Sequence, residues 1–161
     1  MCWCSKLLLV LTPTAIALAA LVGSDVFPMD DPAIQYTAGP VDDPAAALQT
    51  RLDKGQARLK YDEDLGYLPS LLKELHVSNK SQILVFSKTS FQSPRISPRM
   101  PRAVYFGDNI AVGFVRTGDV LEVASLDSKQ GIHFYTVDQS PAAHPQLARR
   151  DVCLQCHVSP A

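Results

Sequence analysis

The sequence from Ala103 to Val137, AVYFGDNIAVGFVRTGDVLEVASLDSKQGIHFYTV, alternates β-rich runs with short turns. The runs are rich in Val, Ile, Phe and Tyr, and the turns between them contain Gly, Asp and Asn. Runs and turns of this kind predict strands that are joined by hairpins and pair antiparallel. We therefore expect a β-meander with strands at residues 103–106, 110–115, 120–126 and 132–137.

Two helices are predicted upstream of the meander. Asp43 and the proline after it form a typical N-cap and first turn, and an apolar stripe follows at helical spacing through Gly55 to Leu59. A second, shorter helix is predicted to begin at Leu68. The run at residues 82–88 is apolar on both alternating faces, which predicts a buried strand covered by these helices.

The remaining segments divide the chain. Residues 1–23 have a weak positive region, a long apolar core and small residues at a cleavage spacing, which predicts a signal peptide or an N-terminal anchor. Residues 24–43 are rich in Asp and Pro, as in a linker. Residues 44–140 form the predicted domain, within which the prolines of residues 89–101 predict a loop, and residues 141–161 form a C-terminal segment.

Composition and charge restrict the class of protein. The chain has 161 residues, of which 47% are apolar and 19% charged, as in globular proteins. Its formal net charge of −1 argues against nucleic-acid binding, which usually needs a basic excess. Acidic residues are concentrated in the first part of the chain, whereas the charged residues between Glu74 and Asp108 are all basic. Such a dipole can orient a docking partner, and an ordinary solvated surface is the alternative.

The C-terminal segment contains Cys153-Leu154-Gln155-Cys156-His157, a CxxCH motif of the kind that attaches haem covalently. Two thiols at this spacing reach the two vinyl groups of one porphyrin, and the imidazole that follows lies under the iron. We predict one haem c, bound by thioethers from Cys153 and Cys156, with His157 as the proximal iron ligand. A zinc site, a redox disulfide, and a structural disulfide or chance match are the alternatives.

These elements together predict the α+β fold class. We expect two N-terminal helices packed on an antiparallel β-meander, with the CxxCH haem-binding peptide as a C-terminal appendage. Residues 146–152 are expected to form one helical turn before the motif.

The distal ligand of the iron is not marked by the sequence. The candidates are His144 in a Pro-rich loop, His133 on a predicted strand and Met100 among the prolines, together with His76 and Met29. A histidine further along the chain, or an open iron, is an equal alternative.

Arg149 and Arg150 immediately precede the motif. Guanidinium groups match carboxylates in geometry, so pairing with the haem propionates is one interpretation of these arginines. Solvated surface charge is the other.

The chain resembles a family of uncharacterised exported bacterial proteins that contain a cytochrome c domain. The resemblance rests on residues 67–73 (YLPSLLK), 85–92 (VFSKTSFQ), 95–99 (RISPR) and the CxxCH motif, and it extends from about Tyr61 to the C-terminus. It implies haem attachment at the two cysteines of the motif and iron ligation by its histidine. Relatives in this family continue well past the motif, so a truncated member is one interpretation of the chain.

The expected function is that of a c-type cytochrome, which transfers single electrons between redox partner proteins of the cell envelope. Such a protein is exported to the periplasm or envelope, with membrane attachment through the N-terminal apolar segment as an option. One alternative is a haem enzyme or sensor that binds a small ligand at an open sixth iron position. A second alternative is a haem-free envelope binding module.

Overall fold

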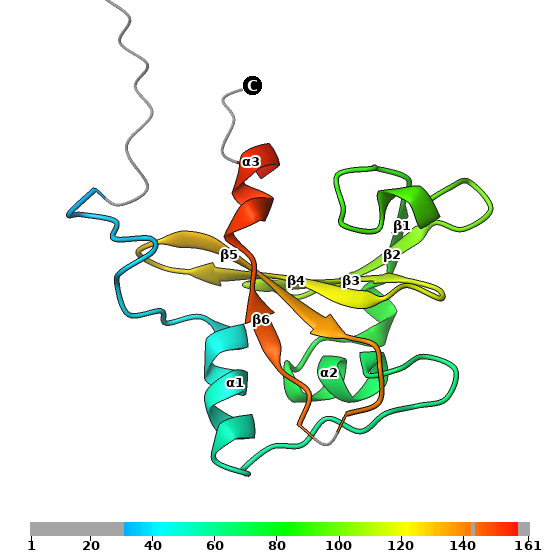
Figure 1. The fold of residues 1–161 in the computed structure, drawn as a ribbon, viewed down its shortest axis with the longest axis horizontal. Coiled ribbons are helices and arrows are strands. Elements are labelled where there is room, and N and C mark those ends of the chain that lie inside the picture. The colour runs from blue at the N-terminus through cyan, green and yellow to red at the C-terminus, as the bar shows by residue number, and fades with distance from the viewer. Residues whose placement is uncertain (1–30, 143, 158–161) are drawn as a thin grey trace, which may run out of the picture.

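The computed structural model describes residues 31–142 and 144–157. Its main element is a six-stranded antiparallel sheet whose strands lie in sequence order. Figure 1 shows α1 and α2 on one side of this sheet, and α3 and the loop after β1 on the other. The strands are β1 (Ile83–Val85), β2 (Arg102–Phe106), β3 (Ile110–Val115), β4 (Val120–Asp127), β5 (Gly131–Asp138) and β6 (Leu147–Arg149). The helices are α1 (Pro44–Asp53), α2 (Leu68–Glu74) and α3 (Leu154–His157), with 3-10 turns η1 (Asn79–Ser81), η2 (Ser93–Arg95) and η3 (Asp151–Cys153).

The four predicted strands of the meander are confirmed, each within one residue at either end. The longest hairpin pairs β4 with β5, from Val120 opposite Asp138 to Asp127 opposite Gly131. Gly131 has a φ of +85°, a conformation that glycine adopts without steric cost, so it permits the chain to turn back at this point.

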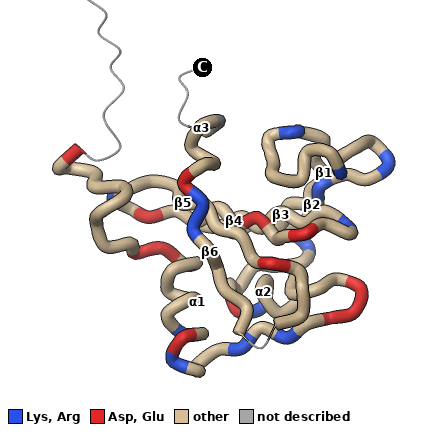
Figure 2. Tube along the Cα trace, viewed as in Figure 1, with Lys and Arg blue, Asp and Glu red and all other residues tan. Residues whose placement is uncertain are grey.

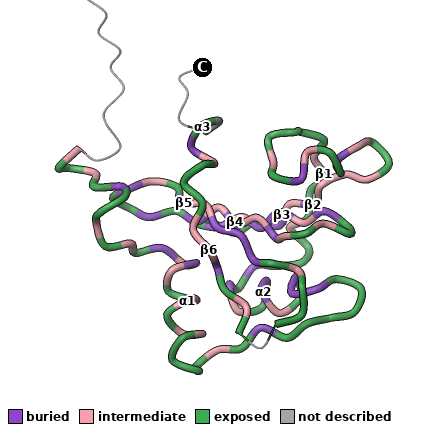
Figure 3. Tube along the Cα trace, viewed as in Figure 1, coloured by how far each residue is buried: buried purple, intermediate pink, exposed green. Residues whose placement is uncertain are grey.

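The first face of the sheet forms the hydrophobic core with α1 and α2. Figure 3 shows most of the buried residues along the strands. From the helices and the segment between them, the core contains Ala45, Leu48, Leu59, Tyr67, Leu68, Leu71, Leu72 and Leu75. From the strands it contains Ala103, Tyr105, Ile110, Val112, Leu121, Val123, Tyr135, Val137 and Leu147.

The first helix begins where the sequence predicts and ends earlier. Asp43 caps α1, since its Oδ1 accepts hydrogen bonds from the amides of Ala45 and Ala46 at 2.8 and 2.9 Å. Gly55, predicted to lie inside the helix, has a φ of +68° and follows the helix end, with its amide bonded to the Leu52 carbonyl. Glycine commonly ends helices in this left-handed conformation, so Leu59 reaches the core from beyond the helix.

The predicted fold class is wrong. The structure is dominated by the antiparallel sheet, and α1 and α2 span only 10 and 7 residues. They begin at Pro44 and Leu68 and are therefore not N-terminal. The architecture is a sheet-rich fold with two short helices on one face and α3 on the other, and it differs from the helical fold of a cytochrome c.

Two further elements differ from the sequence prediction. The first strand, β1, is not buried under the helices: it is a short edge strand in which Ile83 and Leu84 are 48% and 55% exposed. Residues 146–152, expected to form a helical turn, instead provide β6, in which Leu147 pairs with Val137. The C-terminal segment is thus part of the sheet, because β5 offers an edge with unpaired backbone groups.

The stretch before α1 packs against the sheet. Tyr36 is 4% exposed, and its hydroxyl donates to the carbonyl of Ile132 at 2.9 Å. The predicted signal peptide or anchor lies outside the described residues. Within residues 31–142 and 144–157, no helix has the length and apolarity needed to cross a bilayer.

Candidate functional site

The second face of the sheet is largely apolar and is not covered by α1 or α2. Two cross-strand rows follow from the register of the strands. One row runs through Phe106, Ala111, Ala124 and Phe134, and the other through Val104, Gly113, Glu122 and Thr136. An antiparallel sheet with one solvated face normally carries polar side chains there. An apolar second face instead suggests that something covers it.

A cavity of about 360 Å³ lies on this second face. Its floor includes Ala111, Gly113 and Ala124, whose small side chains leave space between the larger residues of their rows. A Cβ on Gly113 would lie at ordinary contact distance, 3.5 Å, from the nearest side-chain atoms, so packing does not demand glycine at this position. The absence of a side chain at Gly113 leaves the floor of the cavity open. The volume is in the range of small-molecule sites.

The CxxCH motif forms one wall of the cavity. After β6 the chain turns over the second face, where the Arg150 amide donates to the Phe134 carbonyl at 2.8 Å. The chain then forms η3 and α3, and Leu154 is buried at 8% exposure. Cys153 and His157 both line the cavity. The second cysteine of the motif, Cys156, lies within α3, but its side chain is outside the described structure.

His157 is positioned by an aromatic contact. Its imidazole stacks on the ring of Phe134, with centroids 4.7 Å apart and 30° between the planes. Offset stacking of this kind orients a ring and contributes about 0.5–1.5 kcal/mol. The histidine that was expected to bind iron is thus held at the cavity by the floor of the sheet.

The loop between β1 and β2 forms the opposite wall, and Glu122 holds it in place. The Ser90 hydroxyl and the Phe91 amide each donate to the Glu122 carboxylate at 2.8 Å. Arg102 Nη1 also donates to it, at 3.0 Å, and the Arg102 and Glu122 side chains are only 17% and 16% exposed. This half-buried ion pair fixes the start of the loop to the sheet.

The cavity wall also contains cationic groups. Lys88 and Arg102 both line the cavity. Figure 2 shows basic residues on the loops that flank β1 and β2, on the same side of the sheet as α3. Among residues 31–142 and 144–157, the Lys88 amine makes no hydrogen bond or ion pair. The sequence analysis missed Lys88, Arg102 and Glu122 as site residues, although the alternation of β2 and β4 places the last two on the face opposite the core.

The predicted distal ligands lie elsewhere. His133 is fully buried on the first face, His144 is exposed in the loop before β6, and Met100 is half-buried in the turn that pairs it with Ser97. His76 is exposed after α2, and Met29 is outside the described residues. None of the candidates within the described residues lines the cavity.

The two arginines before the motif also have other partners. Arg149 Nη2 donates to the Tyr36 carbonyl at 2.5 Å, and the guanidinium lies 4.7 Å from the centre of the Tyr36 ring. Arg150 Nε donates to the Thr136 hydroxyl at 2.9 Å. Neither arginine lines the cavity, so both act here as ties between the C-terminal segment and the rest of the fold.

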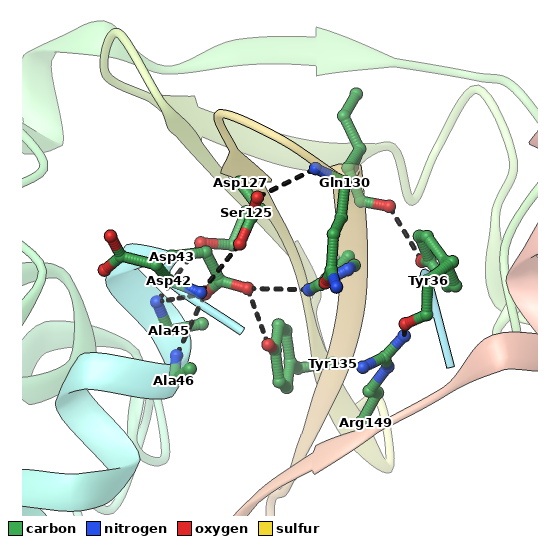
Figure 4. Close-up of polar contacts among 12 residues, drawn as sticks. Tyr36, Asp42, Asp43, Ala45, Ala46, Ser125, Asp127, Gln130, Tyr135 and Arg149 are labelled. Carbon is green, nitrogen blue, oxygen red and sulfur yellow. Dashed lines mark hydrogen bonds and ion pairs between the residues drawn. The ribbon is translucent and has the colours of Figure 1, made fainter. Parts of the chain in front are cut away.

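A buried polar cluster joins the start of α1 to the first face of the sheet (Figure 4). Asp43 Oδ2 accepts a hydrogen bond from the Tyr135 hydroxyl at 2.6 Å and lies 3.1 Å from His133 Nδ1. Burial, with the adjacent Asp43 carboxylate, raises the pKa of Tyr135 well above its ordinary value. The cluster is enclosed by the core, so its role is to fix α1 on the sheet.

Within the described side chains, no three His, Cys, Asp or Glu residues converge in the manner of a metal site. Comparison with protein-family models, with curated proteins and with solved structures finds no match.

Proposed function

We propose that this chain is a c-type haem protein of the cell envelope that transfers single electrons. The observation that carries the proposal is that Cys153 and His157 of the CxxCH motif line one apolar cavity. The motif and the cavity together support this function better than either of them does alone. A chance CxxCH sequence has no reason to lie over an open apolar surface.

The residues of the cavity fit a flat, largely apolar group. Haem needs an apolar support, thiols at its edge and an imidazole on its iron. The sheet offers the small side chains of Ala111, Gly113 and Ala124 as the support. Arg102 provides positive charge for carboxylates at the rim.

Each residue of the motif has a separate task. Thioethers from Cys153 and Cys156 would prevent the cofactor from dissociating, and the His157 imidazole would bind its iron. Phe134 stacks on that imidazole and so fixes its plane. When bound, haem supplies the one-electron couple between ferric and ferrous iron.

Export and redox partners are part of the same proposal. The apolar run from Leu7 to Val22 supports export, and covalent haem of this type is assembled outside the cytoplasm. The partners are envelope redox proteins that approach the exposed end of the cavity. The basic residues around β1 and β2 favour a partner with an acidic surface.

The test is expression of the full chain in a bacterial host that carries haem-attachment machinery. We expect the mass of the product to rise by one haem, with a Soret band that stays with the protein after acid-acetone extraction. The Cys153→Ser, Cys156→Ser double variant is expected to lose both signals. A product without haem would refute the proposal and leave the haem-free binding module.

A second candidate is a haem enzyme or sensor with an open iron position. It is favoured by the placement of His133, His144 and Met100 away from the cavity. In that case the haem-loaded protein would be high-spin, and its ferrous spectrum would change on addition of carbon monoxide. A six-coordinate low-spin spectrum that does not respond would support electron transfer instead.

A further inference from the structure

We propose that the amine of Lys88 is the second axial ligand of the haem iron. This inference rests on the proposed function, since it concerns the same cavity. It replaces the histidine and methionine candidates of the sequence with a residue that the fold brings to the site.

The arrangement of the cavity walls is the first argument. Axial ligands approach an iron from opposite sides of the porphyrin plane. Figure 1 shows α3 and the loop after β1 rising separately from the same side of the sheet. His157 lines the cavity from α3, and Lys88 lines it from that loop. The two nitrogen donors therefore come from two different walls.

The second argument is that the side-chain oxygens of Glu122, Tyr135 and Thr89, which line the cavity, already have partners within the fold. The Glu122 carboxylate accepts from Ser90, Phe91 and Arg102. The Tyr135 hydroxyl donates to Asp43 on the core side of the sheet, and the Thr89 hydroxyl bonds with Ser87 at 2.7 Å.

The remaining nitrogen at this wall that could bind iron belongs to Lys88. A guanidinium such as that of Arg102 stays protonated and has no lone pair for a metal. The Lys88 amine has no partner among the described residues.

The third argument is that the loop that carries Lys88 is anchored to the sheet close to this residue. The bonds of Ser90 and Phe91 to Glu122 anchor the backbone two and three residues after Lys88. Further along, the side-chain amide of Gln92 donates from Nε2 to the Val120 carbonyl at 2.9 Å, and Gln92 is 4% exposed. A ligand on an anchored loop loses less conformational entropy when it binds than a ligand on a mobile one.

Binding of Lys88 to the iron requires the loss of one proton and the donation of one electron pair. A metal takes the deprotonated form of its ligand, so the ammonium proton passes to solvent as the nitrogen lone pair binds the iron. No oxidant or reductant is needed. An amine and an imidazole together give a six-coordinate, low-spin iron.

The experiment compares the haem-loaded full chain with Lys88→Ala, Lys88→Arg and Lys88→Met variants. Lys80→Ala is the matched control, because Lys80 is an exposed lysine of η1 that does not line the cavity. Intact mass reports covalent haem, and the ferric optical and electron paramagnetic resonance spectra report the spin state. Redox titration reports the midpoint potential.

We expect the wild type and Lys80→Ala to be low-spin, and Lys88→Ala and Lys88→Arg to become high-spin with the haem still attached. Lys88→Met is expected to be low-spin with a raised potential, because a thioether ligand favours ferrous iron. If the Lys88→Ala variant fails to attach haem, the spin state and midpoint potential of the Lys88→Met variant test the inference.

Four outcomes would overturn the inference. They are a high-spin wild type, a low-spin Lys88→Ala variant, a Lys88→Arg variant that stays low-spin because only charge at the propionates matters, and an unchanged potential in Lys88→Met. Absence of haem from the wild type, by contrast, would refute the proposed function itself.

Discussion

The imidazole of His157 lies 4.7 Å from the ring of Phe134, with 30° between the two planes. The first residue ends the CxxCH motif and the second lies on β5, so this contact connects the motif to the sheet. The relationship explains how a four-residue helix can hold the His157 imidazole in a defined orientation. It also leads to the first prediction.

Replacing Phe134 with Ala should loosen His157 without preventing haem attachment at the cysteines. The lost aromatic contact corresponds to about 1 kcal/mol, so the ligand should sample several orientations. We expect a broadened ferric electron paramagnetic resonance spectrum and a shifted midpoint potential. Phe106→Ala is the control, because Phe106 lies in the same cross-strand row but does not line the cavity. Equal spectra for the two variants would contradict this role of Phe134.

Replacing Asp43 with Ala should strongly destabilise the fold. The change removes the N-cap of α1 and leaves the buried Tyr135 hydroxyl without its acceptor. Together these losses should lower the free energy of unfolding by about 3 kcal/mol. Urea unfolding followed by circular dichroism measures the change.

Asp42→Ala serves as the control for this prediction. The Asp42 contact with Asp127 is made by its backbone amide, which the variant keeps. We expect a change within about 0.5 kcal/mol for this control. An Asp43→Ala variant as stable as Asp42→Ala would show that the polar cluster does not fix the helix.

Asp127 should make stability depend on acid pH. A hydrogen bond from the Asp42 amide, followed by one from Gln130, holds the pKa of Asp127 below its ordinary value. The unfolded chain therefore takes up this proton before the folded chain does. The contribution is present above the ordinary aspartate pKa and is lost as pH falls through the folded value.

The measurement for this prediction compares the wild type with Asp127→Asn across the acid range. The wild type should be the more stable at about pH 6, and its advantage should shrink as the pH falls towards about 3. A constant difference between the two proteins over that range would exclude Asp127 as a source of the acid sensitivity.

Replacing Glu122 with Gln should loosen the loop after β1. The variant weakens the bonds to Ser90 and Phe91 and leaves Arg102 half-buried without its counter-charge. Loss of one partner from such a pair should cost about 2 kcal/mol. Hydrogen exchange at the Phe91 amide should become faster.

Asp119→Asn is the comparison variant for the loop. Asp119 pairs with Arg95 at 2.8 Å, but the two side chains are 75% and 43% exposed. An exposed pair of this kind contributes at most about 1 kcal/mol, so stability should change little. If both variants had equal effects, burial of the Glu122 pair would not be the reason for its strength.

The second face of the sheet shows what the alternation of residues along a strand can and cannot predict. The register places Ala111, Ala124 and Phe134 in one row, and the sequence spacing of these residues implies a common face once the hairpins are known. Alternation does not say which segment covers that face. The identity of the covering segment depends on the direction in which β6 leads the chain. The sequence predicts a helical turn at residues 146–152, so it does not predict this strand.

The fold class was misjudged for a related reason. The apolar spacing predicts that the first helix continues through Gly55, but the left-handed conformation of this glycine ends α1. The apolar run at residues 82–88 predicts a buried strand, but only a short part pairs, and it does so at an exposed edge. Apolar character alone cannot distinguish a core strand from an edge strand near a cavity.

The sequence by itself determined the strands of the meander, the start of the first helix and the CxxCH motif, because turn residues, caps and thiol spacing act over a few neighbouring residues. Only the tertiary structure decided that the motif faces an apolar cavity, that Glu122 anchors the opposite wall and that Lys88 lines the same space as His157. These relationships join segments between about 30 and about 70 residues apart. They arise from the pairing of β5 with β6 and from the course of the loop after β1, neither of which leaves a local signal in the chain.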